Sequence, residues 1–277
     1  MNIVEMIKSI LFGVVEGITE WLPISSTGHM ILLQDIIPMK VSSEFWNMFL
    51  VVIQLGAILA VVLIFWNKIF PFQLKKDQPL IKADTMKMWF KIVVACLPAA
   101  IIGILFDEIL EKYLYHSYVV AIMLIIFGIG FLVIENRNKG KQARVDRLQD
   151  ITYRDAIMIG LFQLIAAIFP GTSRSGATIL GGLIIGVSRT VSAEFTFFLA
   201  IPVMFGASLL KLVKFGLVFT STEITILLVG MISAFLVSMI VIKFLMDYIK
   251  KHDFKVFGWY RIILGAILIV YFGLQML

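Results

Sequence analysis

The chain has 277 residues, of which 60% are hydrophobic and only 15% are charged. A soluble domain of this length needs a far more charged surface, so the composition excludes an ordinary soluble globular protein. The formal net charge of +6 at pH 7 gathers between apolar blocks, where it is typical of topology signals in membrane proteins. We therefore expect a membrane protein that contacts lipid and binds no nucleic acid.

In chain order, the first element is segment 1–37, which a Pro/Gly/Ser break divides into two short helices with an unwound tip between them. Segment 153–187 has the same pattern later in the chain. Six apolar blocks are predicted to span a membrane, because about 20 apolar residues cross a bilayer. These blocks are 45–66, 88–106, 117–134, 195–210, 224–242 and 262–277. The fold class is thus an all-α polytopic membrane protein.

Charges in the connecting loops predict how the spans are oriented. Lysine and arginine exceed the acids in loops 67–89, 135–154 and 247–257, whereas 107–116 is acidic and 215–221 is uncharged. The positive-inside rule places the basic loops in the cytoplasm. This alternation requires both broken segments to enter and return on the same side, as re-entrant pairs shielded by protein or water. Both termini then lie outside.

The two broken segments also resemble each other in sequence. Three residue pairs lie 147 apart, namely Gly13 and Gly160, Glu16 and Gln163, and Pro23 and Pro170. Gly28 and Gly176 lie 148 apart, and Glu44-Phe45 matches Glu194-Phe195 at a spacing of 150. This collinear order indicates a duplication within a single membrane domain, 1–277, with repeats 1–137 and 150–277. Each repeat would hold a re-entrant pair and three spans, and because three is odd the second repeat is inverted.

Residues 16–29 read EGITEWLPISSTGH and carry two glutamates at membrane depth. Glu16 and Glu20 are four apart and share one helix face. Each ionised side chain at the centre of a span costs about 2.5–3.5 kcal/mol, so the pair requires a reason. Two such carboxylates can hold a divalent cation such as Mg²⁺ or Ca²⁺. The alternative is an interfacial segment in which both glutamates are solvated.

Pro23 ends the first short helix, and a polar stretch follows it. Its members are Ser25, Ser26, Thr27, Gly28 and His29. Hydroxyls and free backbone N–H groups at a helix start form an anion site, although a single hydroxyl would be enough for ordinary N-capping. The histidine is a candidate general acid or base near neutral pH, the alternative being a packed or capping residue.

Residues 170–178 read PGTSRSGAT and place one arginine at membrane depth. The fork of Arg174 matches phosphate oxygens, so we expect it to bind phosphate. The residues expected to surround the phosphate are Gly171, Thr172, Ser173, Ser175, Gly176 and Thr178. The alternative is a structural ion pair with Glu16 or Glu20. Gln54, in a charge-free span, is a weaker candidate, because a buried glutamine is usually satisfied by a neighbouring helix.

These motifs, together with FLVVIQLGAILAV at 49–61 and SAEFTFFLAIP at 192–202, carry a family resemblance. The chain resembles the bacterial undecaprenyl-pyrophosphate phosphatases, also called bacitracin-resistance phosphatases, over nearly its whole length and without departure in the motifs. The resemblance implies hydrolysis of C55 polyprenyl diphosphate to the monophosphate, which recycles the carrier lipid for peptidoglycan synthesis. It also implies an inner-membrane protein with a periplasm-facing site, a divalent cation and an arrangement compatible with a homodimer.

Mapped onto this sequence, the resemblance implies roles for Glu16, Glu20, Ser26, His29 and Arg174. The nucleophile is either Ser26 or a water activated by Glu20 or His29. The acid-phosphatase type of membrane phosphatase is excluded, because no histidine follows Ser173-Arg174 before His252. A lipid flippase or transporter would use the inverted repeat equally well but needs no such residues. A structural scaffold would leave the intramembrane charges unexplained.

Overall fold

The computed structural model describes residues 3–73, 79–216 and 218–275. Over these residues the chain is helical, with isolated bridges in place of strands. The helices are α1 (Ile3–Thr19), α2 (Ser26–Ile36), α3 (Ser43–Ile64), α4 (Trp66–Ile69), α5 (Ala83–Leu114), α6 (Ser117–Asn138), η1 (Leu148–Asp150), α7 (Tyr153–Ile168), α8 (Arg174–Ile184), α9 (Arg189–Phe215), α10 (Ser221–Ile249) and α11 (Lys255–Gln275).

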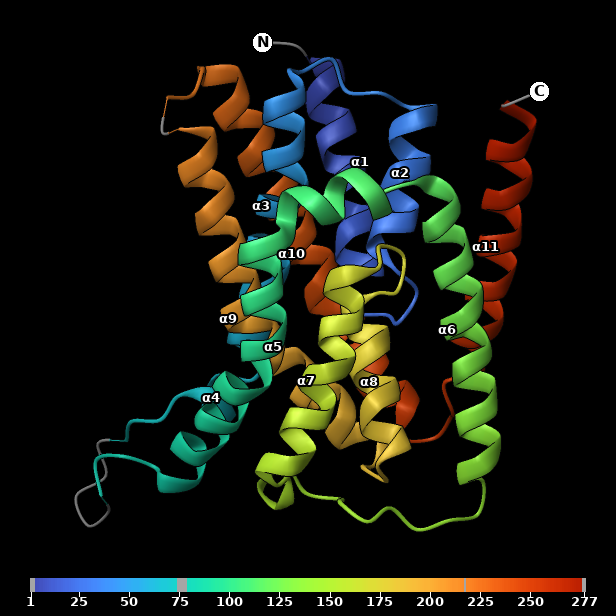
Figure 1. The fold of residues 1–277 in the computed structure, drawn as a ribbon. Helices are drawn as coiled ribbons and strands as arrows, with labels where there is room; N and C mark the ends of the chain where they lie inside the picture. Colours follow the sequence, from blue (N-terminus) through green and yellow to red (C-terminus); the bar gives the residue numbers. More distant parts are fainter. Residues whose placement is uncertain (1–2, 74–78, 217, 276–277) are drawn as a thin grey trace.

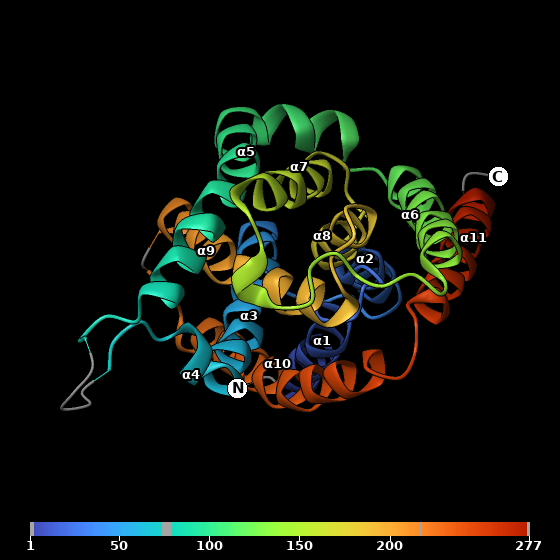
Figure 2. The same cartoon turned by 90° about the horizontal axis from the view of Figure 1, so that it is seen from below.

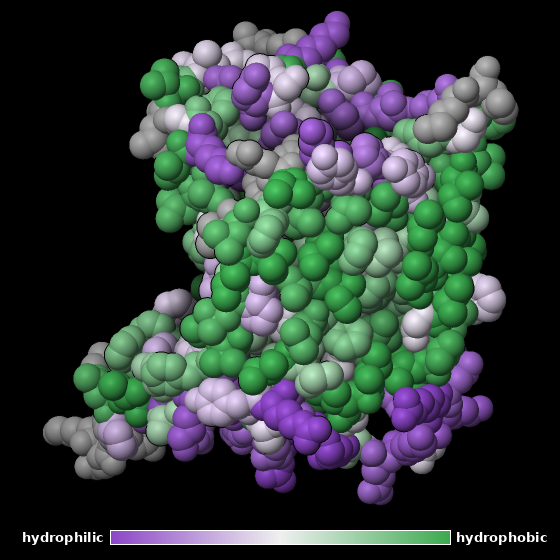
Figure 3. All heavy atoms as spheres, viewed as in Figure 1, coloured by the Kyte–Doolittle hydropathy of each residue, from purple (hydrophilic) through white to green (hydrophobic). Residues whose placement is uncertain are grey.

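Within the described residues, 6 helices are long and apolar enough to cross a membrane. They are α3, α5, α6, α9, α10 and α11, which confirms the predicted all-α, multi-pass membrane protein. Exposed aliphatic and aromatic side chains cover the outer faces of these helices, and Figure 3 shows the resulting apolar band between two polar ends. The short helices α1, α2, α7 and α8 fall outside this set, as the broken segments predicted.

Two predicted boundaries are wrong. The last span begins at Lys255 rather than at residue 262, so a tyrosine and an arginine expected to flank it lie inside the helix. The predicted loop 107–116 is helical as far as Leu114, since Pro98 lies inside α5 and does not end it. The side chains of its acids Asp107, Glu108 and Glu111, like Lys75, Lys76 and Asp77 of the first basic loop, lie outside the described part of the chain.

The short helices form two hairpins, α1–α2 and α7–α8, that come from opposite ends of the molecule (Figure 1). Their connecting loops, 20–25 and 169–173, lie near the middle of its height. We call these two loops the tips. Seen along the perpendicular direction, the short helices lie inside the long helices (Figure 2). Both termini lie at one end, and α4, the loop between α6 and α7 and the loop between α10 and α11 lie toward the other.

Glycines let each hairpin pack tightly against a long helix of the other half of the chain. A Cβ at Gly13 of α1 would collide with the backbone oxygen of Gly230 in α10. A Cβ at Gly160 of α7 would collide in the same way with the backbone oxygen of Ala95 in α5. The two glycines that match at a spacing of 147 therefore serve the same packing purpose. This supports the predicted duplication, which stays a prediction.

Candidate functional site

Both tips end in a strained serine that caps the next helix. Ser25 has a φ of 74° and Ser173 a φ of 68°, and these are the non-glycine residues with positive φ in the described part of the chain. The Ser25 side chain accepts from the N–H of Gly28, and the Ser173 side chain accepts from the N–H of Gly176. Left-handed backbone is costly for a serine and persists where the surrounding structure enforces it, often at functional sites. The two tips thus share one backbone design.

An ion pair joins the tips. Arg174 Nη2 donates to Glu20 Oε1 at 2.8 Å, and Ser26 Oγ donates to Glu20 Oε2 at 2.8 Å. The side chains of Arg174 and Glu20 are only 13% and 8% exposed. The arginine also donates to the carbonyl oxygen of Thr196 at 3.1 Å and lies over the ring of Trp21. The two predicted segments therefore meet, and the alternative of an ion pair with a glutamate is observed for Glu20.

Two hydroxyls near Arg174, those of Ser175 and Thr178, hold backbone, whereas the buried hydroxyl of Thr172 has no hydrogen-bond partner within the described residues. Ser175 Oγ donates to the backbone oxygen of Glu20 at 3.0 Å, which adds a second link between the tips. Thr178 Oγ1 donates to the backbone oxygen of Arg174 at 2.8 Å and accepts from Thr196 Oγ1. These bonds fix the first turn of α8, so in this structure Ser175 and Thr178 hold the backbone that carries Arg174 in place.

Glu16 is buried beside this cluster. It is 1% exposed, and its Oε1 has no hydrogen-bond partner within the described residues. Its burial, and that of Glu20, contradicts the alternative in which both glutamates are solvated at an interface. A buried carboxylate oxygen without a partner costs free energy that a proton or a cation would recover. The cluster thus has one acidic oxygen free to receive a ligand.

A divalent cation fits this donor set only in part. Within the described chain there is no group of three or more His, Cys, Asp or Glu side chains that could hold a metal ion. Glu16 and Glu20 would supply carboxylate oxygens, and Glu20 is already bound to Arg174 and Ser26. Mg²⁺ and Ca²⁺ accept hydroxyl, water and phosphate oxygens as further ligands. Such oxygens would have to complete the coordination of a cation held by Glu16 and Glu20.

His29 lies apart from the ion pair. Its Nδ1 donates to the backbone oxygen of Ser25 at 2.7 Å, so in the neutral ring Nε2 accepts from the hydroxyl of Tyr260, 2.6 Å away. The two rings are stacked, with centroids 5.6 Å apart. No hydrogen bond joins His29 to Glu20, Ser26 or Arg174 among the described residues. The sequence did not point to Tyr260, because it was assigned to the flank of the last span.

Four other predicted residues have different environments. Thr27 and Gln54 are half-buried, and no hydrogen bond ties either to the cluster in the described chain. Gly171 has a φ of 86° and lies against the backbone oxygen of Val120, so a side chain there would be strained and blocked. A Cβ at Gly176 would lie 2.8 Å from a guanidinium nitrogen, Nη1, of Arg261, a residue the sequence analysis missed. Both glycines therefore have structural reasons to be glycine, and phosphate binding by them stays a prediction.

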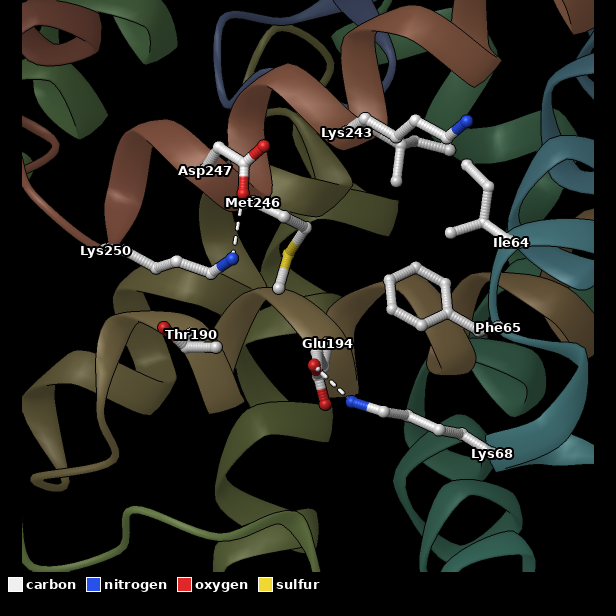
Figure 4. A pocket seen from close by; sticks show the side chains of 10 residues that line it. Ile64, Phe65, Lys68, Thr190, Glu194, Lys243, Met246, Asp247 and Lys250 are labelled. Atoms are coloured by element: carbon white, nitrogen blue, oxygen red, sulfur yellow. Dashed lines mark hydrogen bonds and ion pairs between the residues drawn. The ribbon is translucent and has the colours of Figure 1, made fainter.

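Two surface cavities of the described chain lie away from the tips. The first has a volume of about 410 Å³ and is lined by side chains of α3, α4, α9 and α10 (Figure 4). Lys68 pairs there with Glu194 at 2.7 Å, and Lys250 pairs with Asp247 at 2.8 Å. The second, a neighbouring cavity of about 520 Å³, shares Lys68, Thr190 and Glu194 with the first. Neither is lined by a tip residue, so the size of these cavities does not locate the chemistry.

The sequence matches the family described as bacitracin resistance protein BacA over residues 9–267. A protein of Desulfitobacterium hafniense named undecaprenyl-diphosphatase is 65% identical over 273 residues, covering 99% of this chain and 98% of that protein. Undecaprenyl-diphosphatase 1 of Clostridium acetobutylicum is 63% identical over 272 residues, covering 98% and 99%. An undecaprenyl-diphosphatase of Enterococcus faecalis is 61% identical over 271 residues, covering 98% of each chain.

Proposed function

Since the chain belongs to the bacitracin resistance protein BacA family, we propose that it hydrolyses undecaprenyl diphosphate to undecaprenyl phosphate and inorganic phosphate. Relatives that match almost its entire length carry the name undecaprenyl-diphosphatase. The observation that carries the proposal is the buried Arg174–Glu20–Ser26 arrangement at the meeting of the tips. It combines an anion-binding fork, a carboxylate and a hydroxyl in one place, which phosphoryl transfer requires.

Phosphate binding falls to Arg174 and to the starts of α2 and α8. The guanidinium would exchange its bond with Glu20 for bidentate bonds to the terminal phosphate, since a doubly charged phosphate competes well with one carboxylate. The free backbone N–H groups of both helix starts and the hydroxyls of Ser25, Thr27 and Ser173 would surround the remaining oxygens. The lipid tail would then lie among the spans.

Glu20 is the group placed to receive a proton. Ser26 already donates to it at 2.8 Å, so a serine attack on the terminal phosphorus would pass the hydroxyl proton to Glu20 and break the anhydride P–O bond. Undecaprenyl phosphate would leave, and water would then hydrolyse the phosphoserine. The other route is a single attack by water activated by Glu20 or His29. Where His29 is not the base, it would protonate the leaving oxygen, and its Nε2 would then carry a proton instead of accepting from the hydroxyl of Tyr260.

Glu16 and Glu20 are the residues that would hold a divalent cation, Mg²⁺ or Ca²⁺. The cation would supply positive charge near the transferring phosphoryl group, whose reaction depends largely on positioning and electrostatics. The unpartnered buried Oε1 of Glu16 supports this assignment.

The membrane topology belongs to the same proposal. The basic loops 135–154 and 247–257 and the described part of loop 67–89 lie toward the end opposite both termini (Figure 1), so the positive-inside rule puts that end in the cytoplasm and the termini outside. In the bacterial inner membrane, the α1–α2 hairpin would then be re-entrant from the periplasm and the α7–α8 hairpin from the cytoplasm. Residues 1–137 and 150–277 would be inverted repeats of one domain. A periplasm-facing site would recycle the carrier lipid for peptidoglycan synthesis, with a homodimer as the assembly.

A lipid flippase with the same architecture is the competing function. The buried acid, arginine and hydroxyl favour the enzyme, because a carrier needs no proton acceptor beside a phosphate-binding group. The test is inorganic phosphate release from undecaprenyl diphosphate by detergent-purified protein, where no membrane gradient exists. Release establishes hydrolysis, whereas lipid binding without release would favour transport.

The Arg174→Ala variant tests the site in the same assay. Its turnover should fall at least about 100-fold, because a preorganised charge on the phosphoryl group is lost. Arg189→Lys is the matched control: Arg189 pairs with the buried Glu135, away from the tips, and its variant should keep normal turnover. Near-normal phosphate release by Arg174→Ala would overturn the proposed site.

A further inference from the structure

Arg261 is a buried arginine that contacts both tips. Its side chain on α11 is 0% exposed. Nη1 donates to the backbone oxygen of Pro23 in the first tip at 3.2 Å. Nη2 donates to the backbone oxygens of Gly171 and Thr172 in the second tip, at 3.0 and 2.7 Å. Nε donates to the backbone oxygen of Leu124 in α6 at 3.4 Å.

The environment of this guanidinium is unusual because its hydrogen-bond partners in the described chain are all backbone carbonyl oxygens, while its face lies over the ring of Phe127. No Asp or Glu of the described chain forms an ion pair with it. A buried charge is tolerated only when it is fully hydrogen-bonded. Pro23, Gly171 and Thr172 lie in loops, where a buried carbonyl oxygen has no place in a helical ladder and requires another donor. One guanidinium therefore satisfies such groups beyond the ends of both α1 and α7, and its burial depends on both tips being present.

The second hairpin is shaped to admit this side chain. A Cβ at Gly176 would lie 2.8 Å from Nη1 of Arg261, so any larger residue would displace the guanidinium. At the matching position of the first hairpin, a Cβ at Gly28 would meet only aliphatic methyl groups, of Leu124 at 3.2 Å, Val120 at 3.6 Å and Leu268 at 3.9 Å. The guanidinium of Arg261 thus lies against Gly176 of the second hairpin and not against Gly28, the matching glycine of the first.

We propose that Arg261 is a positioning residue that fixes the two tips against each other, so that Glu20 and Ser26 of the first face Arg174 of the second. The assignment rests on the proposed phosphatase function. Arg261 touches neither the ion pair nor the hydroxyl, and acts through the backbone of Pro23 and of 171–172. Its neighbour Tyr260 adds a contact from the same turn of α11 to His29 of the first hairpin.

An arginine is required for this purpose because of its shape. Five N–H donors in a planar fork reach carbonyls in several directions, whereas a lysine offers a single ammonium head. Arg261→Lys therefore keeps the charge and loses the bridge. Gly176→Ala reaches the same bridge from the other side, because its methyl group would lie 2.8 Å from Nη1; it would also approach Cβ and Oγ of Ser173, at 3.2 and 3.4 Å.

The first experiment compares kinetics of purified protein on undecaprenyl diphosphate. Arg261→Lys should lower kcat about 100-fold, since a misplacement of about 1 Å between reacting groups has an effect of that size. KM should change much less, because Arg174 itself is intact. In a Ser26→Ala background the same substitution should have little further effect, as expected for residues acting through one geometry. Arg189→Lys, the control arginine, should leave kcat unchanged.

The second experiment follows backbone amide hydrogen exchange and requires no activity. Arg261→Lys should raise exchange in the two tips, 20–25 and 169–173, at the same time. Arg189→Lys should raise exchange only near its own partner, Glu135. If Arg261→Lys does not fold, Gly176→Ala takes its place in both experiments, with the same pattern at smaller amplitude.

Three results would overturn the assignment: near-normal kcat in the folded variant, losses that simply add to that of Ser26→Ala, or increased exchange at one tip alone. The proposed function fails in a different way. If the wild-type chain releases no phosphate, hydrolysis is wrong, while the exchange experiment still decides whether Arg261 bridges the tips.

Discussion

The two hairpins have the same backbone and opposite chemistry. In each, a short helix ends, a serine with positive φ caps the next helix, and a glycine follows three residues later. Ser26 and Arg174 occupy the same first position of their helices, α2 and α8. Yet the first hairpin supplies carboxylates, a hydroxyl and an imidazole, and the second supplies the guanidinium of Arg174. Two tips with the same backbone conformation thus carry complementary charges, which meet in the ion pair of Glu20 with Arg174.

The clearest way to break this comparison is to neutralise the acid that joins the hairpins. Glu20→Gln should lower kcat/KM at least about 100-fold, because a carboxylate acting as proton acceptor typically contributes that much. Phosphate release by purified protein measures the effect. Glu194→Gln, which alters a buried acid paired with Lys68 away from the tips, should remain close to wild type. Similar losses in both variants would mean that burial of charge, and not the site, sets activity.

A second way is to make the hairpins alike at Glu16, whose counterpart is Gln163. Glu16→Gln should lower kcat/KM about tenfold and raise the Mg²⁺ or Ca²⁺ concentration needed for half-maximal activity, because the cation loses a carboxylate ligand. Titration of each cation into chelator-treated protein measures this. An unchanged cation dependence would remove Glu16 from any metal site.

The reverse exchange should act on stability. Gln163 is buried, and neither polar atom of its side chain has a partner in the described chain. Gln163→Glu adds an ionisable group that burial penalises, so the melting temperature in detergent should fall. An unchanged melting temperature would show that the second hairpin tolerates the acid it lacks.

The smallest expected effects come from the two serines with positive φ, and they test whether the two tips have equivalent backbone strain and caps. Ser25→Gly and Ser173→Gly should each be near neutral for melting temperature, because relief of about 1–2 kcal/mol of left-handed strain offsets the lost cap. Ser25→Ala and Ser173→Ala keep the strain and lose a cap worth about 1 kcal/mol, so both should melt lower. Paired thermal melts compare the four variants. A different order in the two hairpins would contradict the equivalence of their tips.

Much of the fold could be predicted because the bilayer imposes long apolar blocks and basic loops. The six predicted blocks each overlap one of the candidate spans found in the described residues. The short helices were also predicted, since Pro23 and Pro170 interrupt otherwise apolar segments. Helix ends were less accurate: α5 runs on to Leu114, because a charged stretch that breaks the apolar pattern can still be helical.

The residues of the site differed in how clearly the sequence revealed them. Arg174 and Glu20 were found because a charge in an apolar setting demands a partner. Tyr260 and Arg261 were overlooked because the last span was drawn to exclude charge, which left both residues outside it. Only the three-dimensional packing of α11 against α6 and the tips shows that this arginine is fully buried. Carbonyl partners leave no signature in a sequence, unlike a carboxylate partner.

The glycine contacts of the hairpins bear on how the chain is made. Gly13 fits against Gly230, and Ser9 donates to the backbone oxygen of Ile226 at 2.6 Å, so the first hairpin rests on residues more than two hundred positions later. Gly160, by contrast, fits against Ala95, which has already been synthesised when α7 emerges. During translation the backbone contact of Gly160 is therefore available as soon as α7 emerges, whereas that of Gly13 forms only after α10 has been synthesised.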